Sequence, residues 1–173
     1  MKIEPKYLVL ASLAAAIVAL DQATKIYIHT QFQLGQSLVV IADYFNITYV
    51  RNPGAAFGIL SEAPEMFRRV FFFLMTPLAL AVILLILRGV PSNDRVQVLA
   101  LSLIFGGAIG NYIDRLRFGF VIDFLDFHWR NLYAWPAFNV ADSAIVVGVG
   151  LLILAMFTTP PTVESGDATT TGP

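Results

Sequence analysis

The chain has 173 residues, of which 57% are hydrophobic and only 13% are charged, and its formal net charge at pH 7 is −1. A soluble domain carries about 25% charged residues, so this composition is typical of a membrane protein. The near-neutral charge argues against nucleic acid as a partner, because nucleic-acid-binding domains are usually strongly basic. The absence of cysteine excludes disulfides and thiolate metal sites.

Four apolar runs are each long enough to cross a bilayer, which takes about 20 residues of helix. They predict a mostly α-helical membrane protein with a single domain over residues 1–157 and both chain ends on one side. The first run resembles a signal peptide, but Asp21 and Lys25 follow it where a cleavage region has small neutral residues, so we interpret it as an uncleaved anchor. The predicted spans are Tyr7–Ile28, Phe67–Leu87, Val96–Ile113 and Phe138–Phe157.

The segment between the first two spans, residues 29–66, is too polar to cross the membrane. Its β-branched and aromatic stretches, Ser37–Ile41 and Phe45–Val50, predict a small β-hairpin on the membrane surface. In the turn that follows, spacing alone favours a turn-forming role for Asn52 over a role in a site. We expect a loop over residues 119–137 and a disordered tail over residues 158–173, which are rich in Thr, Pro and Gly.

Acidic residues stand at the boundary of the last span, where a carboxylate is energetically costly. Asp142 opens that span, and Asp123 lies between apolar neighbours just upstream. We expect the two side chains to meet at the membrane surface and to hold one water. Two close carboxylates share a single proton, because the charge on one raises the pKa of the other. One can then activate water while the other donates a proton, as in aspartic proteases, and no metal is required.

The end of the third span combines small and polar residues. Gly106 and Gly110 lie four apart and predict a flat helix face that packs against another helix. Asn111, Asp114 and Arg115 project from one side of a helix, which favours a buried polar network over an interfacial cap. Asp21 and Lys25 of the first span are four apart in the favourable order for an ion pair, and a structural role and a site role are equally consistent with that spacing.

Other chemistries fit the residues less well. Ser143 follows Asp142 but lacks the G-x-S-x-G elbow of a serine hydrolase. The two histidines, His29 and His128, lie far apart and no H-E-x-x-H motif is present, so a zinc peptidase is a weak hypothesis. Two functions fit the residues about equally well: an intramembrane hydrolase, and a proton- or ion-coupled carrier that uses the same acids. The position of the acids at the ends of spans favours a site at the membrane surface.

Five motifs together resemble one known family, the bacterial lipoprotein signal peptidases (signal peptidase II). They occur in the family's order, cover residues 21–143 and are highly specific as a set. The motifs are Asp21-Gln22-Ala23-Thr24-Lys25, residues 51–58 (RNPGAAFG), residues 106–115 (GGAIGNYIDR), Val121-Ile122-Asp123-Phe124 and Phe138-Asn139-Val140-Ala141-Asp142-Ser143.

The resemblance implies an aspartic endopeptidase of the bacterial inner membrane, with cytoplasmic termini and an active site near the outer face. Such an enzyme removes the signal peptide from diacylglyceryl-modified prolipoproteins, before the lipidated cysteine, and uses no cofactor. We expect a monomer that contacts membrane lipid, with the loop around Phe57 closing as a lid. The implied residues are the catalytic pair Asp123 and Asp142, the substrate-pocket residues Asn52, Asn111, Arg115 and Asn139, and the supporting residues Asp21 and Asp114.

Overall fold

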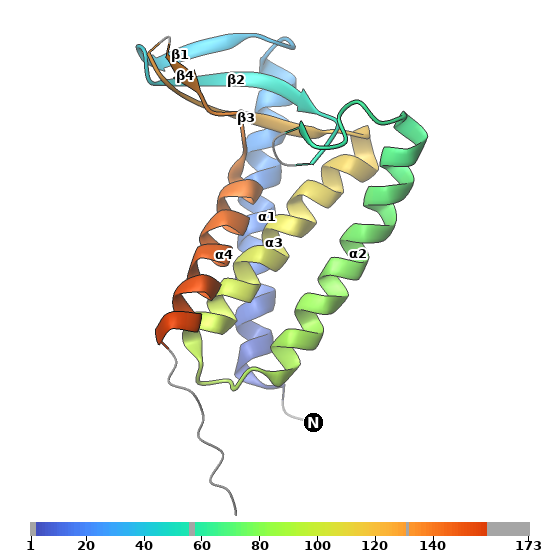
Figure 1. The fold of residues 1–173 in the computed structure, drawn as a ribbon, viewed down its shortest axis with the longest axis vertical. Coiled ribbons are helices and arrows are strands. Elements are labelled where there is room, and N and C mark those ends of the chain that lie inside the picture. The colour runs from blue at the N-terminus through green and yellow to red at the C-terminus, as the bar shows by residue number, and fades with distance from the viewer. Residues whose placement is uncertain (1–2, 56–57, 131, 159–173) are drawn as a thin grey trace, which may run out of the picture.

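The computed structural model of the protein describes residues 3–55, 58–130 and 132–158. Four long helices form a bundle, and a small sheet lies across one end of it (Figure 1). This architecture confirms the predicted fold class, whereas the predicted disordered tail lies outside the described residues from Thr159 onward. In chain order the elements are α1 (Pro5–Gln31), β1 (Ser37–Ile41), β2 (Phe45–Asn52), α2 (Glu65–Gly89), α3 (Arg95–Phe118), β3 (Val121–Trp129), β4 (Tyr133–Ala134) and α4 (Val140–Thr158).

All four predicted spans are helices that are long and apolar enough to cross a membrane. Three of them are longer than predicted, because polar residues continue the helix beyond the apolar run. Helix α1 begins at Pro5, where a missing N–H costs nothing, and runs on to Gln31. Helix α3 ends at Gly119, whose φ of 77° gives the left-handed conformation that commonly terminates helices.

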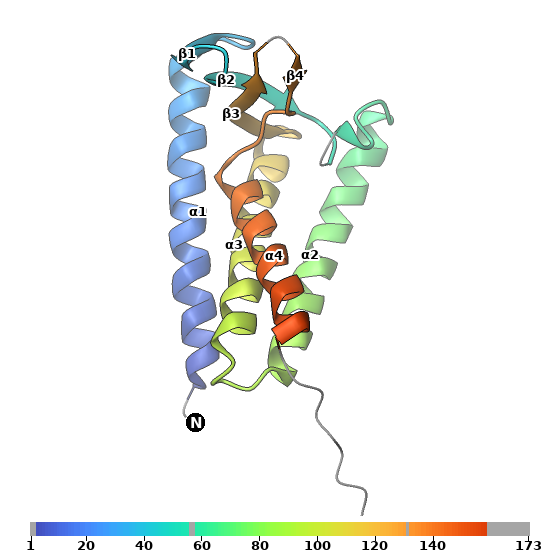
Figure 2. The ribbon, with the colours of Figure 1, turned by 60° about the vertical axis from the view of Figure 1, so that its left-hand side comes forward.

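Helix α3 is the centre of the bundle, and the other three helices pack against it. Helix α2 packs mainly against α3, and its end near the sheet stands apart from α1 (Figure 2). Its large apolar side chains are accordingly exposed, for example 57% of Phe73 and 67% of Leu85. Apolar surface on this scale is unfavourable in water but suits the acyl chains of a bilayer.

Small residues let the helices approach α3 closely. A Cβ atom on Gly106 would lie 2.9 Å from the Cα atom of Ala14 in α1, and one on Gly110 would lie 2.6 Å from a carboxylate oxygen of Asp21. Both glycines therefore face α1, which confirms the predicted packing face. Gly107 faces α4 instead, where a Cβ atom would collide with the carbonyl oxygen of Ala141.

The sheet has four antiparallel strands in the order β1-β2-β3-β4. The predicted hairpin forms its first two strands, with Leu38 opposite Ile47. The prediction of a loop over residues 119–137 is wrong, because Val121–Trp129 is strand β3 and pairs with β2. The segment is rich in β-branched and aromatic residues, but its acids suggested a solvated loop. In the structure Asp123 lies opposite Val50, so a strand carries this acid under the sheet and towards the helices.

Candidate active site

Lys25 lies fully buried between α1 and α3, at the centre of a charged cluster. Its ammonium group is 2.9 Å from Asp21, 3.1 Å from Asp114 and 2.9 Å from the Oδ1 atom of Asn111. Each of the three N–H donors therefore has an acceptor, which offsets the several kcal/mol that burying an unpaired ion costs. The cluster confirms the predicted polar network at the end of α3 and the predicted pairing of Asp21 with Lys25.

The two acids of this cluster also hold the backbone of two distant segments. An oxygen of Asp114 accepts a hydrogen bond of 3.0 Å from the backbone N–H of Ile122, the residue before Asp123. An oxygen of Asp21 accepts one of 3.0 Å from the backbone N–H of Ala141, the residue before Asp142. The cluster thus fixes both chain segments that carry the predicted catalytic acids.

The side chain of Asn139 connects the two predicted catalytic acids. Its Nδ2 atom donates to Asp123 over 2.7 Å and to the Oδ1 atom of Asn111 over 3.2 Å. Asn111 in turn donates from Nδ2 to Asp142 over 2.7 Å. Asn139 and Asp123 are buried, so these hydrogen bonds form in a region of low dielectric, where they hold the carboxylates firmly.

Local sequence explains why Asp142 points towards this network. Asn139 precedes the first residue of α4 and accepts a 2.9 Å hydrogen bond from the backbone N–H of Asp142. Asp142 reciprocates by accepting a 3.2 Å hydrogen bond from the backbone N–H of Asn139. This reciprocal arrangement is a capping box, and it places a carboxylate at the positive end of the helix.

The pKa of Asp123 is raised from 3.8 to about 7. The main cause is desolvation in the buried site, and the charge of Asp142 adds to it. Hydrogen bonds from Asn52 and Asn139 oppose the rise, because they favour the ionised form. Asp123 is therefore partly protonated near neutral pH, mainly because it is buried.

Asn52 combines the two roles that the sequence left open. Its Oδ1 atom accepts a 3.0 Å hydrogen bond from the backbone N–H of Gly54, which is a turn-forming contact. Its Nδ2 atom donates to Asp123 over 3.1 Å. The end of β2 thus reaches the same carboxylate that Asn139 holds from the other side.

Arg115 turns away from Asp114, although the two are neighbours in sequence. Its guanidinium donates to the carbonyl oxygen of Gly54 over 2.8 Å and lies 4.1 Å from the ring centre of Phe72. Asp142 and Asp123 attract its charge across the site, but it forms no salt bridge within the part of the chain that the structure describes. Asp114 instead forms an ion pair with Lys25.

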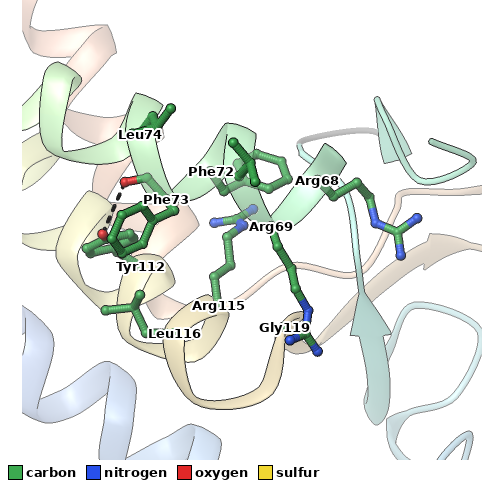
Figure 3. A pocket seen from close by; sticks show the side chains of 10 residues that line it. Arg68, Arg69, Phe72, Phe73, Leu74, Tyr112, Arg115, Leu116 and Gly119 are labelled. Atoms are coloured by element: carbon green, nitrogen blue, oxygen red, sulfur yellow. Dashed lines mark hydrogen bonds between the residues drawn. The ribbon is translucent and has the colours of Figure 1, made fainter. Parts of the chain in front are cut away.

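A cavity of about 340 Å³ opens between α2 and α3 beside Arg115. Figure 3 shows Phe73, Leu74 and Leu116 on its apolar side and three arginines at its other end. Tyr112 closes one wall, where its hydroxyl donates to the carbonyl oxygen of Phe73 over 3.2 Å. The cavity therefore offers an apolar channel that ends next to a cationic part of the site.

Some predicted features lie outside this constellation. Asp126 and His128 belong to a separate pocket on the sheet, together with Asn46. Phe57, on which the lid expectation depends, is outside the described residues. Among the residues that the structure does describe, no three His, Asp or Glu side chains are grouped closely enough to hold a metal ion.

Sequence reasoning did not include Lys25 and Gln22 in the site. Gln22 donates to Asp114 over 2.9 Å and to the carbonyl oxygen of Gly110 over 3.2 Å. The available signal was a lysine in an otherwise apolar helix, which needs a buried partner. Its spacing identified Asp21, whereas its contacts with Asp114 and Asn111 depend on how α1 packs on α3.

Four membrane-spanning helices and two aspartates joined through one asparagine define a multi-pass membrane protein with the constellation of an aspartic peptidase. The sequence matches the signal peptidase (SPase) II family over residues 13–158. The chain therefore belongs to the signal peptidase II family.

Curated relatives and solved structures agree with this membership. The lipoprotein signal peptidase of Geobacter metallireducens is 48% identical over 153 residues, which is 88% of this chain and 93% of the relative. That of Syntrophus aciditrophicus is 50% identical over 143 residues, or 83% and 88% of the two chains. A solved structure described as a bacterial membrane enzyme at 1.9 Å is 37% identical, with a TM-score of 0.72 over 87% of this chain and 94% of that one.

Proposed function

We propose that Asp123 and Asp142 are the catalytic pair with which this chain removes signal peptides from diacylglyceryl-modified prolipoproteins. The observation that carries the proposal is Asn139, whose side chain donates to Asp123 while its backbone N–H donates to Asp142. Both acids are thereby held at one point, at the end of the bundle where the sheet meets the helices.

The chemistry follows from the proton that the pair retains. Asp123, with its pKa near 7, protonates the oxygen of the scissile carbonyl, while Asp142 accepts a proton from the attacking water. The water oxygen adds to the scissile carbonyl carbon, and the departing amine of the lipidated cysteine takes up a proton as the C–N bond breaks. Asp142 gives this proton to the amine, and Asp123 takes a proton from a hydroxyl group of the tetrahedral intermediate, so each turnover restores the starting protonation of the pair.

The neighbouring polar residues divide into two groups. The hydrogen-bonding groups of Asn111 and Asn139 are used within the protein, so we assign these residues to positioning the carboxylates. Arg115 lines the cavity and Asn52 contacts Asp123 from the end of β2, so these two residues are the candidates for contact with the substrate backbone. Asp21 and Asp114 support the site by fixing the backbone before each acid.

The remaining expectations concern the setting of the enzyme. The signal helix of the substrate reaches the site laterally from the lipid, while the acyl chains of its diacylglyceryl group stay in the bilayer. We expect no nucleic-acid partner. We propose a monomer in the bacterial inner membrane with cytoplasmic termini and the sheet on the outer face. The exposed aromatic residues Trp129 and Tyr133 on the sheet support an interfacial position for it.

The direct test is cleavage of a lipidated prolipoprotein peptide by the purified chain in detergent. Asp123→Asn and Asp142→Asn should each abolish cleavage, with a loss of at least about a thousandfold. The first variant lacks the proton donor and the second lacks the base. Both variants should keep the wild-type circular dichroism spectrum, since an amide matches the carboxyl group in shape.

The matched control is Asp126→Asn, which removes an acid from the same strand but from a separate pocket. It should cleave at close to the wild-type rate. Normal turnover by either variant of the pair would overturn the assignment. A complete lack of cleavage by the wild-type chain would instead favour the carrier that the sequence alone leaves open.

A further inference from the structure

Several arginines at the sheet end of the bundle have no role in the proposed reaction. Arg51 and Arg117 are exposed, and within the described part of the chain neither forms an ion pair with an acid. Arg69 pairs with Glu65 over 2.7 Å, but 60% of its side chain is exposed. Unpaired charge at the boundary of a membrane protein indicates a ligand of opposite charge.

These three arginines contact one turn from three different elements. The guanidinium of Arg117 lies 5.0 Å from the ring centre of Phe118 in α3, and that of Arg51 lies 4.7 Å from that of Phe120. At Gly119, which lies between these two residues in sequence, an Nη atom of Arg69 from α2 lies 3.4 Å from the position of a Cβ atom. The turn at residues 118–120 therefore carries three guanidinium groups and one neighbouring carboxylate.

The side chain of Arg51 is fixed in place rather than mobile. Its Nε atom donates to the hydroxyl of Tyr49 over 2.9 Å, and Tyr49 is buried. Its remaining N–H groups make no hydrogen bond within the described residues and stay available. An arginine held in this way loses little conformational freedom when it binds an anion.

The same turn borders the cavity between α2 and α3. Gly119 and Arg69 line its polar end, while Phe73, Leu74 and Leu116 line its apolar part (Figure 3). An apolar channel that ends beneath guanidinium groups at the membrane surface has the shape and charge of an acyl chain joined to a phosphate.

We propose that this turn and cavity form a binding site for an anionic bilayer phospholipid. Arg69 and Arg117 bind the phosphate, Arg51 adds to the positive field, and one acyl chain occupies the cavity against Leu74 and Leu116. Arginine suits a phosphate because its planar fork donates two parallel hydrogen bonds. The diacylglyceryl group of the substrate carries no phosphate, so the arginines distinguish a lipid of the bilayer from the substrate's own anchor.

Native mass spectrometry of the full chain in detergent tests the proposal without requiring cleavage, so its outcome is separate from that of the catalytic assignment. The ligand is dioleoylphosphatidylglycerol, compared with dioleoylglycerol, which has the same chains and glycerol but no phosphate, and with glycerol 3-phosphate, which has no chains. The double variant Arg69→Gln/Arg117→Gln is compared with Arg95→Gln, which removes an exposed charge at the opposite end of α3.

Wild type and Arg95→Gln should bind the phospholipid well above dioleoylglycerol and glycerol 3-phosphate. The double variant should bind the phospholipid about 10- to 30-fold more weakly, in keeping with the usual effect of two interfacial arginines. Equal binding of dioleoylglycerol would show that the cavity recognises acyl chains alone. Equal binding of glycerol 3-phosphate would show a free-phosphate site, and full binding by the double variant would place the lipid elsewhere; each result overturns the proposal.

Discussion

The carboxyl group of Asp123 has a pKa of about 7, because it is buried and lies near a second acid. The unfolded chain releases this proton near the ordinary pKa of 3.8. Between these two values the folded protein binds more protons than the unfolded chain, so the free energy of unfolding falls as pH rises through that window. Burial of Asp123 thus lowers the stability of the folded protein at neutral pH, and the same burial gives the carboxyl group a pKa suited to proton transfer.

Asp123→Asn removes this titration and should make stability less dependent on pH. We expect the Tm of the variant to rise relative to that of wild type from about pH 4 to about pH 7, because the unfolded wild-type chain ionises Asp123 in this range while the folded protein keeps its proton. Thermal unfolding in detergent across this range measures the difference. In Asp142→Asn the neighbouring negative charge is lost, so the pKa of Asp123 should fall. The decrease of Tm with pH should then end at a lower pH than in wild type. A Tm difference that stays constant with pH would contradict the raised pKa.

The individual site residues could largely be predicted from the sequence, but their partners could not. Acids and asparagines at the boundary of apolar runs are conspicuous, because lipid makes each of them costly. Lys25 shows the limit of this reasoning, since only Asp21 lies within one helical turn of it. Its contacts with Asp114 and Asn111 join α1 to α3 and depend on tertiary packing.

At the scale of elements, the contact between α3 and α4 sets the position of Asp142. Gly107→Ala should separate these helices, because the added Cβ atom would collide with the carbonyl oxygen of Ala141. We expect Tm to fall, with a destabilisation of about 1–3 kcal/mol that is typical of overpacking, and cleavage to fall more than tenfold. Thermal unfolding and the peptide assay measure the two effects.

Gly150→Ala is the matched control for this substitution. Gly150 lies in α4, and a Cβ atom there would meet no other atom within 4 Å. Alanine is favoured over glycine inside a helix by about 1 kcal/mol, so stability should be unchanged or higher. A similar loss of cleavage in both variants would show that the close contact at Gly107 does not position Asp142.

The helices were predictable from the sequence because length and apolar composition determine which segments can span a bilayer. Strand β3 was not, because Asp123 and Asp126 interrupt its apolar pattern. Its pairing with β2 satisfies the backbone, and the polar network of Asn52 and Asn139 satisfies Asp123. From the local sequence, an acid at this position argues against a strand. In the structure, the hydrogen bonds of Asp123 instead hold the strand against the helices.

At the scale of the whole molecule, the orientation in the membrane is open to a direct test. A simple count of positive charge would place the sheet end inside, whereas family resemblance places it outside. The arginines at the turn of residues 118–120 explain the conflict if they bind lipid phosphates of the outer leaflet. The sequence contains no cysteine, so single cysteines can be introduced as probes without a background.

Gln33→Cys lies at the sheet end, and Asn93→Cys lies in the link between α2 and α3 at the other end of the bundle (Figure 1). In intact spheroplasts a membrane-impermeant maleimide should label Gln33→Cys, while Asn93→Cys should react only after the membrane is disrupted. The reverse pattern would place the termini outside and the proposed catalytic pair on the cytoplasmic face.

The hydrogen bonds from Asp21 to Ala141 and from Asp114 to Ile122 have a consequence for biosynthesis. The side chain of Asp21 in the first helix holds the backbone beside an acid of the last helix, so a nascent chain that still lacks α4 does not contain the complete proposed pair. We therefore expect hydrolytic competence to arise only when α4 has inserted. We expect this latency during synthesis to follow from the order of the segments.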